Sequence, residues 1–424
     1  MAEPNDLTPT DGKKTLTDKD IVCLGHLKRV FPLLDRLHDV GCQRDKAGNR
    51  QLHFDDYCKL VLLYTWNPCI NSIKMLQEAV GLKSVAKAMG VKRFSDGSFS
   101  ESVRIFKPEM LKEIINELAG EVQPVPQDPR LAKLNLALTL VDGTVLAALP
   151  RLARAACQGT RYCTTRTGLA LYGWRLHAQV DLLTFTPRRM DRTGACSSGE
   201  AREGQVLANT LTAGRCYVSD GAYGEGHLFD QIIDIGSSFV GRIRENSTFE
   251  VLDERLLSQE ALNANVVRDA LVQWTGKHPI RIVAVQIKPC PRRGGSGGKD
   301  SEPSDLLVIA TNLLDLPAEL IALIYQQRYS VELFFRFFKH LLGMGHLISQ
   351  RQEGIDIQTY CAVIVCLLVN LITGRKPNKA MLTMVGFYLM GMADEEELLA
   401  FLNKPDNRGV KKRAKEELFK KLGW

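Results

Sequence analysis

The spacing of apolar residues changes twice along the chain and divides it into three regions. From Asp20 to Leu118 apolar positions recur mostly three or four residues apart, which predicts helices. Beyond the proline-rich segment Pro124–Pro129, short apolar runs alternate with amphipathic stretches, which predicts strands and helices in turn. Helical spacing returns at about Pro317. The expected fold class is therefore α/β, with a mixed β-sheet flanked by helices and helical N- and C-terminal regions.

The middle region predicts a mixed sheet that begins with three consecutive strands. Strands and helices follow in the order β-β-β-α-β-α-β, at 134–144, 172–184, 184–193, 199–214, 215–223, 226–236 and 237–243. From about Arg244 to Asp305 this rhythm breaks, and strand-like pieces precede a glycine-rich stretch that predicts a flexible loop. A further strand at 305–312 leads into a long helix from about Pro317 to Leu342.

The two ends of the chain differ from its middle. Residues 1–18 are polar and are expected to be disordered, and residues 19–123 predict a helical N-terminal DNA-binding domain. Its clearest signal is a helix, a glycine turn and a second helix over 84–106, although such turns are also common in helical domains that bind no DNA. Residues 346–424 predict a helical C-terminal region with a tail, 404–424, of eight basic and three acidic side chains.

Charge and composition leave the partner open but permit nucleic acid. The 424 residues carry a net charge of +7, and their 45% apolar content excludes collagen, coiled coil and wholesale disorder. Positive charge gathers in residues 131–199, where nine basic side chains accompany three acidic ones. Most of the nine are arginines, whose planar guanidinium can bind phosphate through two hydrogen bonds. A solvated loop is the alternative interpretation of this stretch.

The cysteines and the apolar runs indicate a compartment. Eleven cysteines form no CxxC pair, and Cys361 and Cys366 fall within an apolar run, so reduced core thiols are expected. The N-terminus lacks the apolar segment of a signal peptide. The longest apolar run, Tyr360–Ile372, is shorter than the roughly 20 residues that span a bilayer and predicts a buried helix. A soluble, cytoplasmic protein without a membrane partner is expected.

Three acidic residues carry the candidate chemistry. Asp142 and Asp220 each end a predicted strand, and the active sites of open α/β sheets lie at the carboxyl ends of strands. Either residue alone is better explained as a cap or turn residue. Glu332 lies in the middle of the predicted long helix.

The helix around Glu332 carries a specific pattern. Helical spacing places Tyr325, Arg328, Glu332 and Lys339 along one side. A salt-bridged surface stripe explains Arg328 beside Glu332, but it does not explain the flanking tyrosine and lysine. The pattern Y-x2-R-x3-E-x6-K resembles the signature of one large group of bacterial insertion-sequence DDE transposases.

Two other motifs are similar to that group. Asp142-Gly143-Thr144 follows an apolar strand, and Asp220 is followed by Tyr223 and Gly224. The resemblance covers about 133–371 and implies a ribonuclease-H-like catalytic core in residues 130–243 and 306–345. It also implies an inserted β-rich subdomain at 244–305, in the longer gap between the second and third acids.

The resemblance implies that Asp142, Asp220 and Glu332 are the catalytic residues and the metal ligands. Three converging carboxylates repel one another unless a cation neutralises them, and hard oxygen ligands suit two Mg²⁺ ions, with Mn²⁺ as an alternative. Two such ions support in-line displacement at phosphorus. The implied activity is cleavage at transposon ends and strand transfer into target DNA, cut-and-paste through hairpin ends. The implied partners are double-stranded DNA, both terminal inverted repeats and target, and a second copy of the chain in the DNA complex, at the bacterial nucleoid.

Further residues are expected at the DNA. The resemblance implies phosphate contacts from Arg328 and Lys339, a phosphate or base contact from Tyr325, and a flipped base stacked on Trp274, for which packing is an equal alternative. The arginine-rich stretch adds Arg151 and Arg154. His177 could approach the acids, although a hydrogen-bonded strand histidine is the simpler interpretation.

Three other functions share some of these sequence features. A phosphatase of the haloacid-dehalogenase type also has Asp-Gly-Thr after a strand, but it needs a nucleophilic aspartate where this chain has Leu140. A DNA-binding regulator derived from a transposase usually has an altered acid, and all three acids are present. A stand-alone metal-dependent nuclease stays open, because the same site serves hydrolysis and strand transfer.

Overall fold

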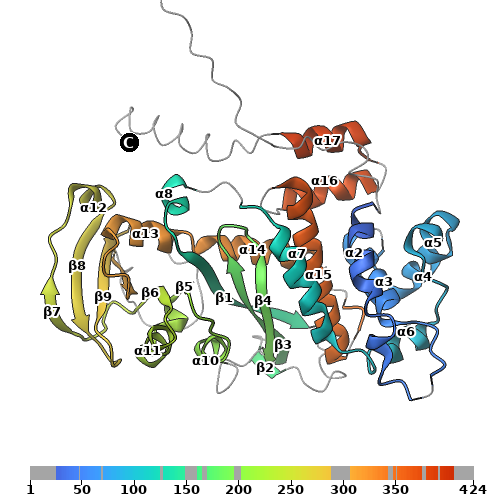
Figure 1. Ribbon diagram of the computed structural model, residues 1–424, viewed down its shortest axis with the longest axis horizontal. Helices are drawn as coiled ribbons and strands as arrows, with labels where there is room; N and C mark the ends of the chain where they lie inside the picture. Colours follow the sequence, from blue (N-terminus) through green and yellow to red (C-terminus); the bar gives the residue numbers. More distant parts are fainter. Residues whose placement is uncertain are drawn as a thin grey trace, which may run out of the picture.

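The computed structural model describes most of the chain (Figure 1). The described residues are 25–46, 48–67, 70–124, 128–148, 160–164, 170–194, 202–287, 306–341, 347–349, 351–374, 379–389 and 392–404. The segment expected to be disordered, the glycine-rich loop and nearly all of the basic tail lie outside these ranges.

Ten strands of the described residues form a mixed sheet at the centre of the protein, and one of them, β2 (Thr160–Thr164), pairs with one end of β3 (Ala170–Asp181). One part of this sheet has a well-known topology. That part comprises β1 (Ala137–Ala148), β3, β4 (Pro187–Gly194), β5 (Arg215–Ser219) and β6 (Ser238–Arg242). Their spatial order is β4-β3-β1-β5-β6. The first three strands are antiparallel, and β5 and β6 run parallel to β1. This is the ribonuclease-H-like arrangement, so the expected fold class is confirmed.

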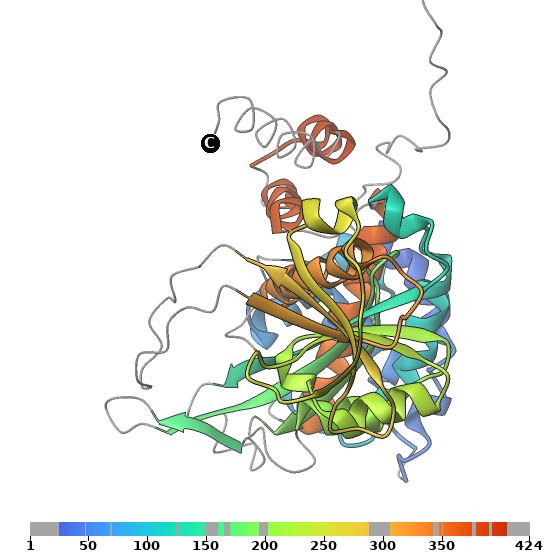
Figure 2. The ribbon, with the colours of Figure 1, turned by 90° about the vertical axis from the view of Figure 1, so that its left-hand side faces the viewer.

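The sheet continues beyond β6 through four antiparallel strands. They are β10 (Leu306–Thr311), β9 (Ile280–Gln286), β8 (Val266–Gln273) and β7 (Glu250–Glu254), and the short helix α12 (Gln259–Asn263) precedes β8. The β-rich content predicted for 244–305 is present, and among the described residues it extends the central sheet through β10. Figure 2 views this end of the twisted sheet.

A buried arginine fastens the extension to the rest of the fold. Arg281 on β9 is 2% exposed, and its guanidinium donates to both carboxylate oxygens of Asp269 on β8, at 2.8 and 2.7 Å. It also donates to the backbone carbonyls of Leu313 and Leu314, at 3.1 and 3.2 Å, in the loop after β10. A buried guanidinium with this many acceptors is fully compensated, so it ties β8, β9 and this loop together.

Helices cover both faces of the sheet. On one face lie α10 (Glu203–Ala208) and α11 (Gly226–Asp234), which pack over Val141 and Tyr217. On the other face lie α13 (Ala318–Gln326), α14 (Tyr329–Leu341) and α15 (Gln352–Thr373). Because residues alternate along a strand, the even-numbered side chains of β1 and β5 face the second group, as Leu140 and Val218 do.

The N-terminal region is helical, as its apolar spacing predicts. Its helices are α2 (Gly25–Asp35), α3 (Phe54–Trp66), α4 (Ile73–Gly81), α5 (Lys83–Met89), α6 (Asp96–Ser102), α7 (Leu111–Glu121) and α8 (Pro129–Ala132), with short 3-10 turns at Val40–Cys42 and Pro108–Met110. Helices α5 and α6 form the predicted helix, glycine turn and helix, and Gly90 ends α5 with φ +69°. Beyond α15 the C-terminal region contains α16 (Lys379–Leu389) and α17 (Glu395–Asn403).

Helix α15 lies between the sheet and the N-terminal helices (Figure 1). It is long and apolar enough to cross a membrane by length and composition alone, but it is mostly buried within the protein. It begins at Gln352, eight residues before the apolar run that predicts it. The additional residues include polar ones that are also buried, such as Gln358, which an apolar pattern does not detect. Cys361 and Cys366 are free, buried thiols, as expected.

Three predicted elements differ from the structure. The predicted helix 199–214 is only Glu203–Ala208 among the described residues, and Thr210 ends it by donating its hydroxyl to the carbonyls of Val206 and Leu207. The predicted strand 134–144 continues to Ala148, because β3 pairs with it along this whole length. The predicted long helix at 317–342 is two helices, α13 and α14.

Candidate active site

Strands β1 and β5 bring the first two acids together. The parallel pairing of β1 and β5 ends at Leu140 and Val218, two residues before Asp142 and Asp220 respectively. Asp220 directly follows β5, as predicted, whereas Asp142 lies within the longer β1 rather than at its end. Both side chains project from the sheet face covered by α14, since they share the parity of Leu140 and Val218.

Each of the two carboxylates accepts a hydrogen bond from a backbone amide one or two residues further along the chain. Asp142 Oδ1 accepts a hydrogen bond of 2.8 Å from the amide of Gly143. Asp220 Oδ1 accepts one of 2.9 Å from the amide of Ala222 and so caps the 3-10 turn Gly221–Tyr223. Burial, together with the neighbouring charge of Asp220, raises the pKa of Asp142 to about 6. At neutral pH the negative charge of the two carboxylates is therefore not fully balanced by neighbouring positive charge.

The second motif also fixes its own loop by packing. Tyr223 is 2% exposed in the core on the α11 face. A Cβ atom at Gly224 would lie 2.8 Å from the backbone oxygen of Arg242, so only glycine fits this close approach of two backbone segments. These two residues set the position of the chain directly after Asp220.

Glu332 and its companions lie on two helices rather than one. Tyr325 is near the end of α13, and α14 begins at Tyr329. Between the helices, the amide of Arg328 donates to the carbonyl of Tyr325, and the amide of Val331 donates to that of Arg328. These bonds span three residues, so the turn is tight and the chain keeps its general helical course.

The basic residues of this pattern face the two aspartates. Arg328 Nη2 donates to Glu332 Oε1 at 2.8 Å, and the charge of Asp142 also acts on Arg328. Asp142 likewise acts on the half-buried ammonium of Lys339, whose pKa burial lowers. Tyr325 is close enough to Asp220 for that carboxylate to affect its pKa, which burial raises. The structure thus brings all four residues to the neighbourhood of the acids.

The donor set fits a hard divalent cation. Two half-buried carboxylates lie side by side at the strands, and a third is presented by α14. Burial and the charge of Asp220 raise the pKa of Asp142, and a bound cation would offset both effects. Ligand oxygens of the three carboxylates do not all lie within 4.8 Å of one another, and Glu332 is turned to Arg328. A cation would be held by Asp142 and Asp220, with Glu332 completing the set after release from Arg328.

Two groups of metal-ligand types occur elsewhere among the described residues, in the N-terminal helices. One is His38, Asp39 and His53, and the other is His38, Asp55 and Asp56. His38 Nδ1 already lies 2.8 Å from Asp55 Oδ1, and the Lys59 ammonium is 3.0 Å from Asp55 and 3.7 Å from Asp56. This lysine supplies the positive charge that the second group needs.

The remaining predicted residues have other positions. Arg151 and Arg154 lie outside the described residues. Trp274 follows β8 and packs on Phe229 of α11, with ring centroids 5.9 Å apart, and its stacking on a DNA base stays a prediction. His177 on β3 is opposite Gly143 of β1, and its Nε2 lies 2.9 Å from Thr193 Oγ1. Burial lowers the pKa of His177 to about 4, so it is a neutral, hydrogen-bonded strand histidine.

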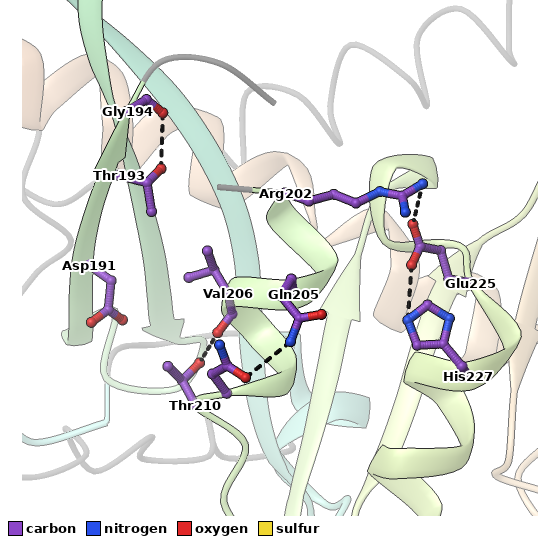
Figure 3. A pocket seen from close by; sticks show the side chains of 10 residues that line it. Asp191, Thr193, Gly194, Arg202, Gln205, Val206, Thr210, Glu225 and His227 are labelled. Atoms are coloured by element: carbon purple, nitrogen blue, oxygen red, sulfur yellow. Dashed lines mark hydrogen bonds and ion pairs between the residues drawn. The ribbon is translucent and has the colours of Figure 1, made fainter. Parts of the chain in front are cut away.

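Two further residues near the acids, Glu203 and Arg175, belong to no sequence motif. Glu203 begins α10, and its side chain pairs with Arg175 of β3. The same helix borders a pocket of about 1140 Å³ next to β4 (Figure 3). One side of that pocket carries Arg202, which pairs with Glu225 at 3.0 Å. The one signal for Glu203 in the sequence is the glycine at 143, which leaves space on β1 for another side chain.

Comparisons with known proteins agree with the motifs. A chain segment of 200 residues is 25% identical to "Putative transposase y4zB" of Sinorhizobium fredii, over 47% of this chain and 53% of that protein. The chain thus spans about half the length of this relative. A segment of 307 residues is 24% identical to "Probable transposase for insertion sequence element IS5377" of Geobacillus stearothermophilus, over 72% of this chain and 74% of that protein.

One solved structure and one family model also match. The structure is a piggyBac transposase synaptic complex with hairpin DNA, with a TM-score of 0.39 and 10% identity over 93% of this chain and 83% of that chain. The family model is the transposase DDE domain, which matches residues 136–368, more than half of the chain and the segment that contains Asp142, Asp220 and Glu332. The chain belongs to the transposase DDE domain family.

Proposed function

We propose that the chain is a DNA transposase that cleaves the ends of an insertion sequence and joins them to target DNA. The observation that carries this proposal is the adjacency of Asp142 and Asp220 on the sheet face covered by α14, the helix that presents Glu332. In this proposal the three acids are the catalytic residues. Family membership supports the reaction class, and the alignments with bacterial insertion-sequence relatives support the kind of element.

The three carboxylates would hold two divalent cations, Mg²⁺ or Mn²⁺. When bound, such ions lower the pKa of an attacking water or 3′-hydroxyl and stabilise the leaving oxygen. Asp142 must lose its proton to bind a cation. The charge of Arg328 favours its ionised form, and Lys339 also interacts with Asp142. Glu332 would hold the cation in place of its contact with Arg328, and the guanidinium would then be free to bind a phosphate.

The DNA backbone would run along α14. Arg328 and Lys339 are the cations on the face directed at the acids, and each would bind a phosphate flanking the bond that is cut. Tyr325, half-buried on the Asp220 side, would contact a phosphate or a displaced base. Arg151 and Arg154 would extend this contact, as their clustering in the sequence predicts.

We infer a dimer in the DNA complex, because an element has two ends and each chain has one set of the three acids. The route is cut-and-paste. Water hydrolyses one strand and frees a 3′-hydroxyl, which attacks the opposite strand to give a hairpin and releases the flanking DNA with a 3′-hydroxyl. A second water opens the hairpin, and the 3′-hydroxyl of the opened end attacks the target and displaces a 3′-hydroxyl of the target strand. A bacterial chain with this activity acts in the cytoplasm, at the nucleoid.

The products of one reaction test the proposal. The chain is incubated with Mg²⁺, labelled duplex carrying the terminal inverted repeats that flank its gene, and a plasmid target. Nicks at the repeat, hairpins and plasmid-joined ends are expected on denaturing gels. Binding without any product would assign the chain as a regulator, and nicking without joining would assign it as a nuclease. Either result would overturn the proposal.

A further inference from the structure

Gly143, next to Asp142, marks the position of a fourth carboxylate at this site. Its missing side chain would project from the sheet face opposite to Asp142, toward α10, as Val141 does. A Cβ atom built there would lie 2.6 Å from Glu203 Oε1. Even alanine at 143 would therefore displace the Glu203 carboxylate from this position.

Glu203 is held in that place from a third element. Its side chain is 11% exposed, and it forms an ion pair with Arg175 of β3, whose side chain is 19% exposed. Arg175 lies opposite Val145 of β1 in the strand register, two residues along from Gly143. Burial raises the pKa of Glu203, and the guanidinium opposes that rise. The pair connects α10, β3 and the back of β1.

The peptide on which Glu203 packs is also the one that orients Asp142. The amide of Gly143 donates to Asp142 Oδ1 at 2.8 Å. A shift of this peptide would therefore turn the Asp142 carboxylate. Glu203 acts on Asp142 in two ways, although the two side chains project from opposite faces of β1. Its packing against Gly143 holds the peptide that orients Asp142, and its charge also contributes to the raised pKa of Asp142.

We propose that Glu203 and Arg175 are positioning residues, whose ion pair holds the Asp142–Gly143 peptide from behind so that Asp142 faces the cation site. This inference rests on the proposed function, since it assigns a cation to Asp142. Groups that orient a ligand in this way typically change metal affinity 10- to 100-fold when they are removed.

A role of Glu203 as a direct metal ligand predicts different behaviour. If Glu203 bound the cation, Arg175 would compete with it, and removal of Arg175 would strengthen metal binding. If the ion pair holds the peptide, removal of either partner weakens metal binding. Glu203→Gln and Arg175→Gln thus separate the two roles by the sign of the second effect.

The first test is Mn²⁺ binding to the full chain without DNA, measured by calorimetry. We expect roughly 10-fold weaker binding in both Glu203→Gln and Arg175→Gln. Arg202→Gln is the matched control. Arg202 directly precedes Glu203 in the chain, but its ion pair is with Glu225 and does not involve β1. It should bind Mn²⁺ as the wild type does. Wild-type affinity in Glu203→Gln, or tighter binding in Arg175→Gln, would overturn the inference.

The second test uses the contact with Gly143. Gly143→Ala should weaken Mn²⁺ binding strongly in the wild type and much less in a Glu203→Ala background, where the added methyl group has space. Equal effects in the two backgrounds would contradict the inference. Where Arg175→Gln fails to fold, judged by circular dichroism, Arg175→Lys and Glu203→Asp keep the charges and should give smaller losses of the same sign; wild-type affinity in both would count against it.

Failure of the inference is distinct from failure of the proposed function. If the wild type binds no Mn²⁺ and makes no nicks, the proposed function fails. If the wild type does both and the variants match it, only the positioning role of Glu203 and Arg175 is wrong.

Discussion

Asp142 on β1 lies beside Asp220 at the end of β5, and burial together with this second carboxylate raises the pKa of Asp142 to about 6. Side-by-side acids without a counter-charge are costly for the folded chain. The cost is the expected signature of a site that gains a cation, and it gives a first prediction.

Asp142→Asn should stabilise the metal-free protein at neutral pH. The folded pKa lies above the unfolded value of about 3.9, so the folded state binds more protons between these values, and wild-type stability falls as the pH rises through this window. The variant lacks this loss and should gain on the order of 1 to 3 kcal/mol above pH 6, with little difference near pH 4. Thermal unfolding with a chelator at several pH values measures it.

Added Mg²⁺ should reverse the order of the two proteins. Ligand binding raises the melting temperature of the wild type, while Asp142→Asn, which lacks a metal-binding carboxylate, should respond little. A wild type that is as stable as the variant at pH 7.5 without metal would contradict the strain attributed to Asp142 and Asp220.

Arg328→Ala should lower the rate of nicking by about 100-fold, because Glu332 loses the partner that orients it and the phosphate loses its guanidinium. Arg328→Lys keeps the charge without the planar guanidinium, and its nicking rate should lie between those of the wild type and Arg328→Ala. Arg336→Ala is the control on the same helix, since Arg336 is exposed and donates to Tyr329 at 2.5 Å. Single-turnover cleavage measures all three, and equal losses in Arg328→Ala and Arg336→Ala would refute the specific role.

Lys339→Ala should weaken DNA binding in a salt-dependent manner. One lost phosphate contact reduces the slope of log binding constant against log salt by about 0.9. Fluorescence anisotropy with the repeat duplex, in a chelator, measures the slope between 50 and 200 mM salt (roughly the range in which counterion release dominates). An unchanged slope would show that Lys339 contacts no phosphate.

Arg281→Met should destabilise the fold by about 3 to 5 kcal/mol, because Asp269 is left buried and unpaired. The double variant Arg281→Met, Asp269→Leu removes both charges and should recover much of this loss, although the carbonyls of Leu313 and Leu314 lose their donor. Urea unfolding measures both variants. A single variant as stable as the wild type would show that this buried pair does not hold the extension.

The sequence predicted the fold class and the order of most strands and helices along the chain, because apolar periodicity and glycine turns are local signals. It did not predict the short strand β2 (Thr160–Thr164). The features that the sequence did not predict depend on contacts between segments that are far apart in the chain. The local sequence predicts that the first strand ends at Thr144. Pairing with β3 extends β1 to Ala148, so Asp142 lies within the strand. The break between α13 and α14 at Gln327 carries no proline or glycine and arises from the tight turn at Arg328.

The candidate site shows the same division. Asp142, Asp220 and Glu332 stand in motifs, so they could be named from the sequence, and their catalytic role stays a prediction. Glu203 and Arg175 belong to no motif, and only the three-dimensional contact with Gly143 brings them to the site. Trp274 was named from the family resemblance, with packing as an equal alternative. It packs on Phe229 in the structure, and its stacking on a DNA base stays a prediction.

Cleavage of DNA by the three carboxylates can be tested most directly by nicking of the terminal-repeat duplex with Mg²⁺ in Asp142→Ala, Asp220→Ala and Glu332→Ala. We expect each variant to bind the duplex like the wild type and to nick it at least about 100-fold more slowly, since each loses a metal-binding carboxylate. Wild-type nicking in any one of the three variants would contradict this role of the carboxylates.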